Sequence, residues 1–399
     1  MGSGSSKTRV LPFSHSQHTV SGADFYWACR NDNLQAAKNI YPHLTYEQLN
    51  EVQPNGSTAL HDACARNHIH VVKFLLEIGC SRTTLNSQHQ TAYEIASPAI
   101  RELFKRPTSE RFVQHYAGGL IKNNSFNNAK DDELETPDDW VTGRTSDYST
   151  YEAQFMLALG QSNSVFKNIV KKRLERNHNE ELLKLFNKSI SPIHGDYKNA
   201  KSLLEKFFQK LGVRHLITLY TMETSFYENL KDEADALTAI LYLNLHELRN
   251  RSFTGRSYRG ATMNQSDLDA YRWASQKKES WRTHILETRI LQSTSTEKSV
   301  ALGFLGGQHG SDRFSVLIEF EFPDHSPTAI NLSKLSEQLP CLSQYEDENE
   351  VLVLPFTLFT LRDFKENDTD ADYRIILQHY PTPKRSLRKA ASESDYFFI

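Results

Sequence analysis

The segment "YEDENEVLVLPF", residues 345–356, places a cluster of acidic side chains directly before an apolar run. From Val351 onward the residues are almost all apolar and include β-branched ones, which is typical of a strand covered on both faces. Like charges at the start of a buried strand repel one another, so folding alone does not explain Glu346, Asp347, Glu348 and Glu350. In a strand, residues i and i+2 face the same side. The pattern therefore predicts that Glu348 and Glu350 point into one pocket.

The flanking sequence predicts a helical lobe followed by a β-rich lobe. Apolar residues recur at helical spacing over residues 166–186, 199–211 and 234–248, and the first of these places Leu182, Leu183 and Phe186 on one face. Strand patterns follow in "TRILQSTS" (288–295), "RFSVLIEFEF" (313–322) and "EVLVLPFTLFTL" (350–361). This order indicates an α+β domain.

The N-terminal part carries an internal repeat. The segment "NGSTALHDACARNHIHVVKFLLEIGC", residues 55–80, resembles an ankyrin repeat, and "TAYEIA" repeats its "TALHDA" pattern 33 residues later. Upstream, "ACRNDNLQAAK" (28–38) echoes "ACARNHIHVVK" (63–73). We expect two to three all-α repeats over residues 21–107, with degenerate outer copies. Ankyrin repeats bind partners, so a protein partner of this stack is expected.

Composition limits the remaining choices. The 399 residues carry a formal net charge of −3, which gives no argument for nucleic-acid binding. The apolar runs fall short of the roughly 20 residues of a membrane helix, and no signal-peptide pattern is present. Four scattered cysteines favour reduced thiols and a cytoplasmic location, and the histidines show no metal-ligand spacing.

The remaining segments complete the expected organisation. Residues 1–20 are predicted to be a flexible leader, in which "MGSGSSK" also fits N-myristoylation of Gly2 and hence a weak peripheral membrane association. Residues 108–194 are a linker and helical connector, including the polar stretch 122–139. Residues 195–380 form the α+β domain, and residues 381–399 a flexible tail.

Three short segments of the β-rich lobe carry the chemistry. In "SYRGA" (257–261), Arg259 offers a fork of donors that suits phosphate oxygens, and Gly260 permits close backbone approach. In "LQSTSTEKSVALGF" (291–304), three hydroxyl residues end a strand. The third segment is the opening one. Alone, the arginine could form a structural salt bridge and the hydroxyls could cap a helix.

Taken in order, this Arg, Ser-Thr-Ser and Glu-x-Glu set resembles the arginine-specific mono-ADP-ribosyltransferases of the R-S-E type. "LYTMETSFYENLK" (219–231) also resembles the helix entry of that family, and the resemblance covers roughly residues 195–380. It implies a helical lobe with a split β-sandwich NAD+-binding core, and transfer of one ADP-ribose to arginine of a protein substrate. NAD+ is the implied donor, and no metal is implied.

The resemblance also implies a role for each site residue. Glu350 would stabilise the oxocarbenium-like ribose. Glu348 would bind the acceptor guanidinium and accept its proton. For NAD+ itself, the implied contacts are Arg259 on the pyrophosphate, Ser293 with Thr294 and Ser295 beside the ribose, Gly260 at the amide and Phe304 at the nicotinamide ring. Tyr345 would touch the acceptor, whereas Glu346 and Asp347 are interpreted as a solvated acidic loop.

Alternatives remain open at this point. The domain could be an NAD+ glycohydrolase with water as acceptor, a catalytically inactive scaffold, or a transferase with another acceptor. Two departures from the family stand out: Glu346 replaces a frequent proline, and "QSDLDAYRWASQKKESWRTH" (265–284) lengthens one connection, most simply as a surface insertion. Whether the repeats recruit a substrate or shield the site is not decided by the sequence.

Overall fold

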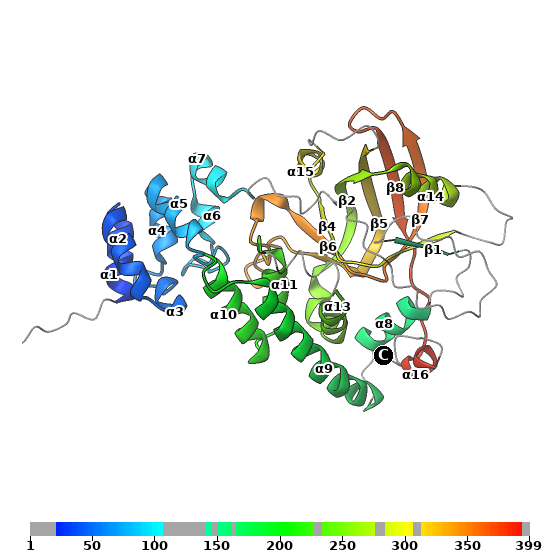
Figure 1. Cartoon of the computed structure of the whole chain (residues 1–399), viewed down its shortest axis with the longest axis horizontal. Helices are drawn as coiled ribbons and strands as arrows, with labels where there is room; N and C mark the ends of the chain where they lie inside the picture. Colours follow the sequence, from blue (N-terminus) through cyan, green and yellow to red (C-terminus); the bar gives the residue numbers. More distant parts are fainter. Residues whose placement is uncertain are drawn as a thin grey trace, which may run out of the picture.

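The computed structural model describes residues 21–106, 141–144, 151–161, 165–224, 226, 234–275, 284–305 and 313–392. The predictions on Gly2 and on the linker 122–139 lie outside these residues. We call residues 21–106 the repeat domain and the described residues from 141 to 392 the C-terminal domain. Figure 1 shows the repeat domain beside α10 of the C-terminal domain.

The repeat domain is all-α. Its helices are α1 (Gly22–Arg30), α2 (Leu34–Ile40), α3 (Tyr46–Leu49), α4 (Ala59–Ala65), α5 (Ile69–Glu77), α6 (Ala92–Ile95) and α7 (Pro98–Arg101), with 3₁₀ turns η1 (Tyr41–His43) and η2 (Glu102–Phe104). Thr58 and Thr91 form capping boxes at the starts of α4 and α6. These local caps explain why the "TALH" and "TAYE" patterns recur.

The C-terminal domain begins with a helical layer made of α8 (Tyr151–Gln161), α9 (Val165–Ser189), α10 (Tyr197–Phe208), α11 (Arg214–Thr221), α13 (Ala234–Leu243) and the 3₁₀ segment η4 (Leu245–Arg251). The three predicted helices are present. However, the third ends at Leu243 and continues as η4, and Leu183 is exposed, because the buried face of α9 uses Leu182 and Leu185 instead.

The tail does not follow the prediction of flexibility from residue 381. Residues Leu387–Ala391 form helix α16, which is capped by Ser386 and packs on α8. Leu387, Ala390 and Ala391 are buried in the same hydrophobic core as the helical layer. Arg388 and Lys389 separate Leu387 from Ala390, so the sequence of this short segment shows no clear apolar pattern.

Eight strands form the sheet: β1 (Val141–Arg144), β2 (Ser252–Met263), β3 (Ile285–Thr288), β4 (Gln292–Ser295), β5 (Phe314–Asn331), β6 (Glu350–Val353), β7 (Leu358–Glu366) and β8 (Tyr373–His379). Their order is β1-β3-β7-β8-β5-β2-β4-β6, and the end of β5 also pairs with β6. The long strand β5 thus pairs with β8 on one side and forms a closed group with β2, β4 and β6 on the other. The predicted fold class, all-α repeats followed by an α+β domain, is confirmed.

Two predicted strands are each divided in two. The segment 288–295 breaks between β3 and β4, and the segment 350–361 breaks between β6 and β7. In the second case Pro355 cannot donate to a ladder, and Phe356 has a positive φ of 63°. The apolar run continues through the break because Leu354 packs in the core below the sheet. Hydrophobicity alone therefore overestimates the strand length.

The long charged segment after β2 is not only a surface insertion. Its first part forms helix α14 (Gln265–Ser275), which packs on β7. Leu268 and Tyr271 of this helix are almost completely buried in the core of the sheet. Asp269 faces solvent, whereas Leu268 and Tyr271 cover one face of the strands and Asp267 is buried with them. A second short helix, α15 (Lys298–Gly303), packs on β2 and β4.

The two domains are in contact. Lys334 forms an ion pair with Glu94 of α6 at 2.6 Å and donates to the carbonyl oxygen of His89 at 3.1 Å. Tyr46 donates to Asn199 at 2.6 Å. A Cβ on Gly195 would meet the carbonyl oxygen of Glu77 at 2.3 Å, so the backbones of the two domains approach closely. We call the connection between β5 and β6, residues 332–349, the β5–β6 loop.

Candidate functional site

The three segments singled out in the sequence meet on β2, β4 and β6. Tyr258 pairs with Ser295 across β2 and β4, and Ser295 pairs with Glu350 across β4 and β6. Ser295 and Glu350 are buried, and Tyr258 is partly buried. Among the described residues there is no helix long and apolar enough to span a membrane, and no group of three side chains that could hold a metal ion. Antiparallel pairing thus brings Arg259, Ser293 and Glu350 into one region of the closed strand group.

Arg259 is a buried cation with only 2% of its surface exposed. Its Nη1 donates to the carbonyl oxygen of Ser293 at 2.7 Å. Its Nε has no hydrogen-bond partner among the residues that the structure describes. A buried guanidinium with an unsatisfied donor is costly unless an anion completes it. Its environment therefore suits an anionic ligand.

The three hydroxyl residues of β4 have different partners. Ser293 shares a hydrogen bond of 3.1 Å with the hydroxyl of Tyr220 on α11. Thr294 donates to the carbonyl oxygen of Val351 at 2.8 Å, and Ser295 donates to that of Glu348 at 2.6 Å. The last two hydroxyls therefore connect β4 to β6 and to the β5–β6 loop. This is a structural role that the sequence did not predict for them.

Glu348 and Glu350 do not lie on one continuous strand, which corrects the expectation based on alternation. Glu348 ends a 3₁₀ turn (Glu346–Glu348, η5), and Asn349 adopts the left-handed conformation with φ 45° and ψ 51°. Glu350 is the first residue of β6. Both carboxylates nevertheless act electrostatically on the same guanidinium, that of Arg106.

Glu350 is held by a residue that sequence reasoning missed. Ser343 of the β5–β6 loop donates to Glu350 Oε2 at 2.9 Å, and its Oγ also accepts from the backbone N–H of Tyr345 at 3.2 Å. Gln344, the next residue, donates from its backbone to Thr221 on α11 at 3.0 Å. The loop is therefore fixed against the helical layer and in turn fixes the carboxylate. A lone serine seven residues before Glu350 gives no recognisable sequence signal.

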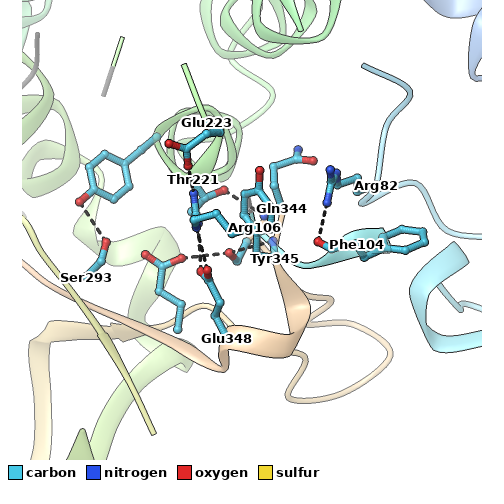
Figure 2. Close-up of polar contacts among 12 residues, drawn as sticks. Arg82, Phe104, Arg106, Thr221, Glu223, Ser293, Gln344, Tyr345 and Glu348 are labelled. Carbon is cyan, nitrogen blue, oxygen red and sulfur yellow. Dashed lines mark hydrogen bonds and ion pairs between the residues drawn. The ribbon is translucent and has the colours of Figure 1, made fainter. Parts of the chain in front are cut away.

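A cluster around Glu348 is the main feature that the sequence did not predict. Arg106 donates from Nε to Glu348 Oε1 at 2.7 Å and from Nη2 to Glu348 Oε2 at 2.9 Å. Its Nη1 donates to Glu223 Oε2 at 2.5 Å. The guanidinium carbon lies 3.8 Å from the centre of the Tyr345 ring. Figure 2 shows Arg106 between Glu223 and Glu348, with Tyr345 beside it.

The remaining predicted residues lie at α15. A Cβ on Gly260 would meet the carbonyl oxygen of Ala301 at 2.3 Å, so the absence of a side chain lets α15 pack directly on β2. Phe304 is the C-cap residue of α15 and is partly buried. Packing of α15 is sufficient to explain the glycine, and the predicted contact of Phe304 with a ring stays a prediction.

Comparison with known proteins supports the description of the repeat domain. Residues 25–105 match the family model of ankyrin repeats, in three copies. The curated "NAD-capped RNA hydrolase NUDT12" of Homo sapiens and of Macaca fascicularis is 50% identical over 48 residues, which is 12% of this chain and 10% of each of those proteins. The chain thus spans about a tenth of the length of these relatives. Residues 25–105 are ankyrin repeats.

Solved structures that align with this chain include ADP-ribosyltransferases. The Vis toxin of Vibrio splendidus is 20% identical, with 56% of this chain and 90% of that chain covered and a TM-score of 0.26. The Clostridium limosum C3 exoenzyme is 14% identical over 46% of this chain and 94% of its own, with a TM-score of 0.27. The type III effector XopAI of Xanthomonas axonopodis is 15% identical over 58% and 88%, with a TM-score of 0.29. At these scores the likeness carries no weight.

Proposed function

We propose that the C-terminal domain is an NAD+-dependent protein-arginine mono-ADP-ribosyltransferase. The observation that carries this proposal is the bidentate hold of Glu348 on a guanidinium, two residues before Glu350 at the start of β6. The family resemblance of the Arg259, Ser293 and Glu350 segments supplies the reaction class. The pairing of β2, β4 and β6 supports it, because it brings those segments together.

The residues present fit NAD+ as the donor. Arg259 is buried and has an unsatisfied donor, which matches a cation that binds a pyrophosphate. The hydroxyl of Ser293 lies on β4 beside β6, where Glu350 begins the strand. When bound, NAD+ supplies the ADP-ribose and a nicotinamide leaving group. Arg259 would hold the phosphates, while Ser293 and Glu350 would face the nicotinamide ribose.

The two carboxylates would divide the chemistry between them. The bond from ribose C1′ to the nicotinamide nitrogen breaks, and its electron pair leaves with the nicotinamide. Glu350, positioned by Ser343, stabilises the positive charge that develops on the ribose. A guanidino nitrogen of the acceptor forms the new bond to C1′ and loses one proton. Glu348 is the group that binds this guanidinium and accepts the proton.

The ankyrin repeats would bind a protein partner or substrate. Trp27 and Ile69 of the stack are about half exposed, and large apolar side chains of this kind are common anchors in interfaces. A cytoplasmic location, with a weak peripheral membrane association through acylated Gly2, is part of the same proposal. NAD+ glycohydrolysis is the second candidate function, since water could replace the acceptor at the same ribose.

The test follows nicotinamide release and ADP-ribosyl-agmatine formation from NAD+ in the full chain. We expect Glu350→Gln to abolish both, whereas Glu348→Gln loses transfer and retains some NAD+ hydrolysis. Glu337→Gln, an exposed change in the β5–β6 loop, is the matched control and should behave like the unmodified protein. Equal nicotinamide release with and without agmatine, and no labelled product, would favour the glycohydrolase. Binding of NAD+ with no nicotinamide release would exclude both activities.

A further inference from the structure

The cluster around Glu348 has the composition of a binding site for a guanidinium group. Two carboxylates from different elements, Glu348 of the β5–β6 loop and Glu223 after α11, hold the three nitrogens of Arg106. The ring of Tyr345 covers one face of that plane. A bidentate carboxylate and an aromatic face match a planar fork of donors and do not match a lysine ammonium.

The occupant comes from the other domain. Arg106 follows η2, the last turn of the repeat domain, and only 3% of its side chain is exposed. Arg82 of the same domain donates to the carbonyl oxygen of Phe104 at 2.8 Å, and its guanidinium carbon lies 4.8 Å from the centre of the Tyr345 ring. Figure 2 shows Arg82 beside Phe104 and Arg106 beside Tyr345. Docking of the repeats therefore delivers this guanidinium to the site.

We infer that Glu348, Glu223 and Tyr345 form the acceptor-guanidinium site, and that Arg106 occupies it as an internal mimic of the substrate arginine. This inference rests on the proposed transferase activity and extends it in two ways. It assigns Glu223 as a second carboxylate that recognises the acceptor. It also makes an external arginine compete with Arg106 for entry.

The geometry indicates that Arg106 blocks the site and is not itself modified. Each of its three nitrogens already donates to a carboxylate. Burial alone would lower the pKa of Arg106, but its hydrogen bonds and charge attraction to Glu348 outweigh this and raise the pKa. A guanidinium that is held so firmly in its protonated form is a poor nucleophile.

Competition by Arg106 predicts a measurable change in acceptor affinity. If Arg106 occupies the site in about nine molecules of ten, the apparent affinity for an external guanidinium falls about tenfold. Arg106→Ala should therefore lower the KM for agmatine by about tenfold or more, with little change in the KM for NAD+. Arg106→Lys should give an intermediate value, because an ammonium cannot form the bidentate pair. Lys105→Gln, an exposed neighbour of Arg106, is the control and should leave the KM unchanged.

Glu223 is tested in the background without its internal partner. In Arg106→Ala, the further change Glu223→Gln should raise the KM for agmatine and leave the KM for NAD+ little changed. Urea unfolding of each variant reports whether the site is still folded, and Arg106→Lys keeps the test informative if Arg106→Ala unfolds.

Two outcomes would overturn the inference and leave the proposed function intact. The first is transfer to agmatine with the same KM in the unmodified protein and in Arg106→Ala. The second is mass-spectrometric detection of ADP-ribose on Arg106, which would make it an acceptor. A different result separates the two proposals: if agmatine raises the melting temperature of Arg106→Ala but no nicotinamide is ever released, the guanidinium site stands and the transferase assignment fails.

Discussion

Replacement of Glu346 should stabilise the protein in a strongly pH-dependent manner. The sequence predicts Glu346 as part of a solvated loop, but its side chain is partly buried, with Oε1 shielded from solvent, close to Thr91 and Glu94 of the repeat domain. Burial raises the pKa of Glu346 from 4.5 to about 7. The carboxylate of Glu94 raises it further, whereas a hydrogen bond from Thr91 and the cations Lys334 and Arg101 lower it.

The sign and size of the effect follow from this pKa. A carboxyl whose pKa is raised by folding binds its proton more tightly in the native state, so stability is lost as the pH rises from 4.5 to about 7. Each tenfold change in proton affinity corresponds to about 1.4 kcal/mol, so the whole loss is about 3 kcal/mol above the raised pKa. Glu346→Gln carries no ionisable group and avoids this loss.

Urea unfolding at about pH 5 and about pH 8 measures the difference. We expect Glu346→Gln to match the unmodified protein within about 1 kcal/mol at the lower pH and to exceed it by about 2 to 4 kcal/mol at the higher one. Glu337→Gln removes an exposed carboxyl of the same loop and should show no such divergence. A constant difference between Glu346→Gln and the unmodified protein at both pH values would refute the reasoning.

Three further predictions concern other contacts of the site and core. Ser343→Ala removes the donor to Glu350 and should lower kcat for nicotinamide release by about tenfold to a hundredfold, with the KM for agmatine little changed; an unchanged kcat would show that Ser343 does not position the carboxylate. Gly260→Ala forces α15 away from β2 and should lower the free energy of unfolding, measured in urea, by about 1 to 3 kcal/mol. An unchanged free energy would mean that α15 can move away from β2 without loss of stability. Leu387→Ala leaves a cavity in the core and should lower the free energy of unfolding by about 2 to 5 kcal/mol, whereas the same change in a flexible tail would leave it unchanged.

Much of the N-terminal fold could be predicted because it is local. The hydroxyl of Thr58 accepts from the backbone of His61, and that of Thr91 accepts from the backbone of Glu94. Such caps span only four successive residues, so they leave a repeated signal in the sequence. The motifs around Arg259, Ser293 and Glu350 could also be read from short segments. Each residue lies on its own strand, and these strands pair with one another in the sheet.

Local patterns failed where a single backbone conformation or a packing contact decided the outcome. Asn349 is left-handed, so the alternation expected from Glu348 to Glu350 does not apply. Leu387 and its neighbours form a helix only because a core already built by α8 receives them. Hydrophobic periodicity reports which face of an element is apolar, but it does not report what that face will meet.

The sequence by itself determined the two kinds of domain and the identity of the residues on β2, β4 and β6, because caps, periodicity and short motifs act over a few residues. Only the tertiary structure decided what lies against Glu348. Arg106 and Glu348 are 242 positions apart, and neither belongs to a pattern that refers to the other. Their contact exists because the repeat domain docks on the β5–β6 loop and because a buried carboxylate and a buried guanidinium each need a partner of opposite charge.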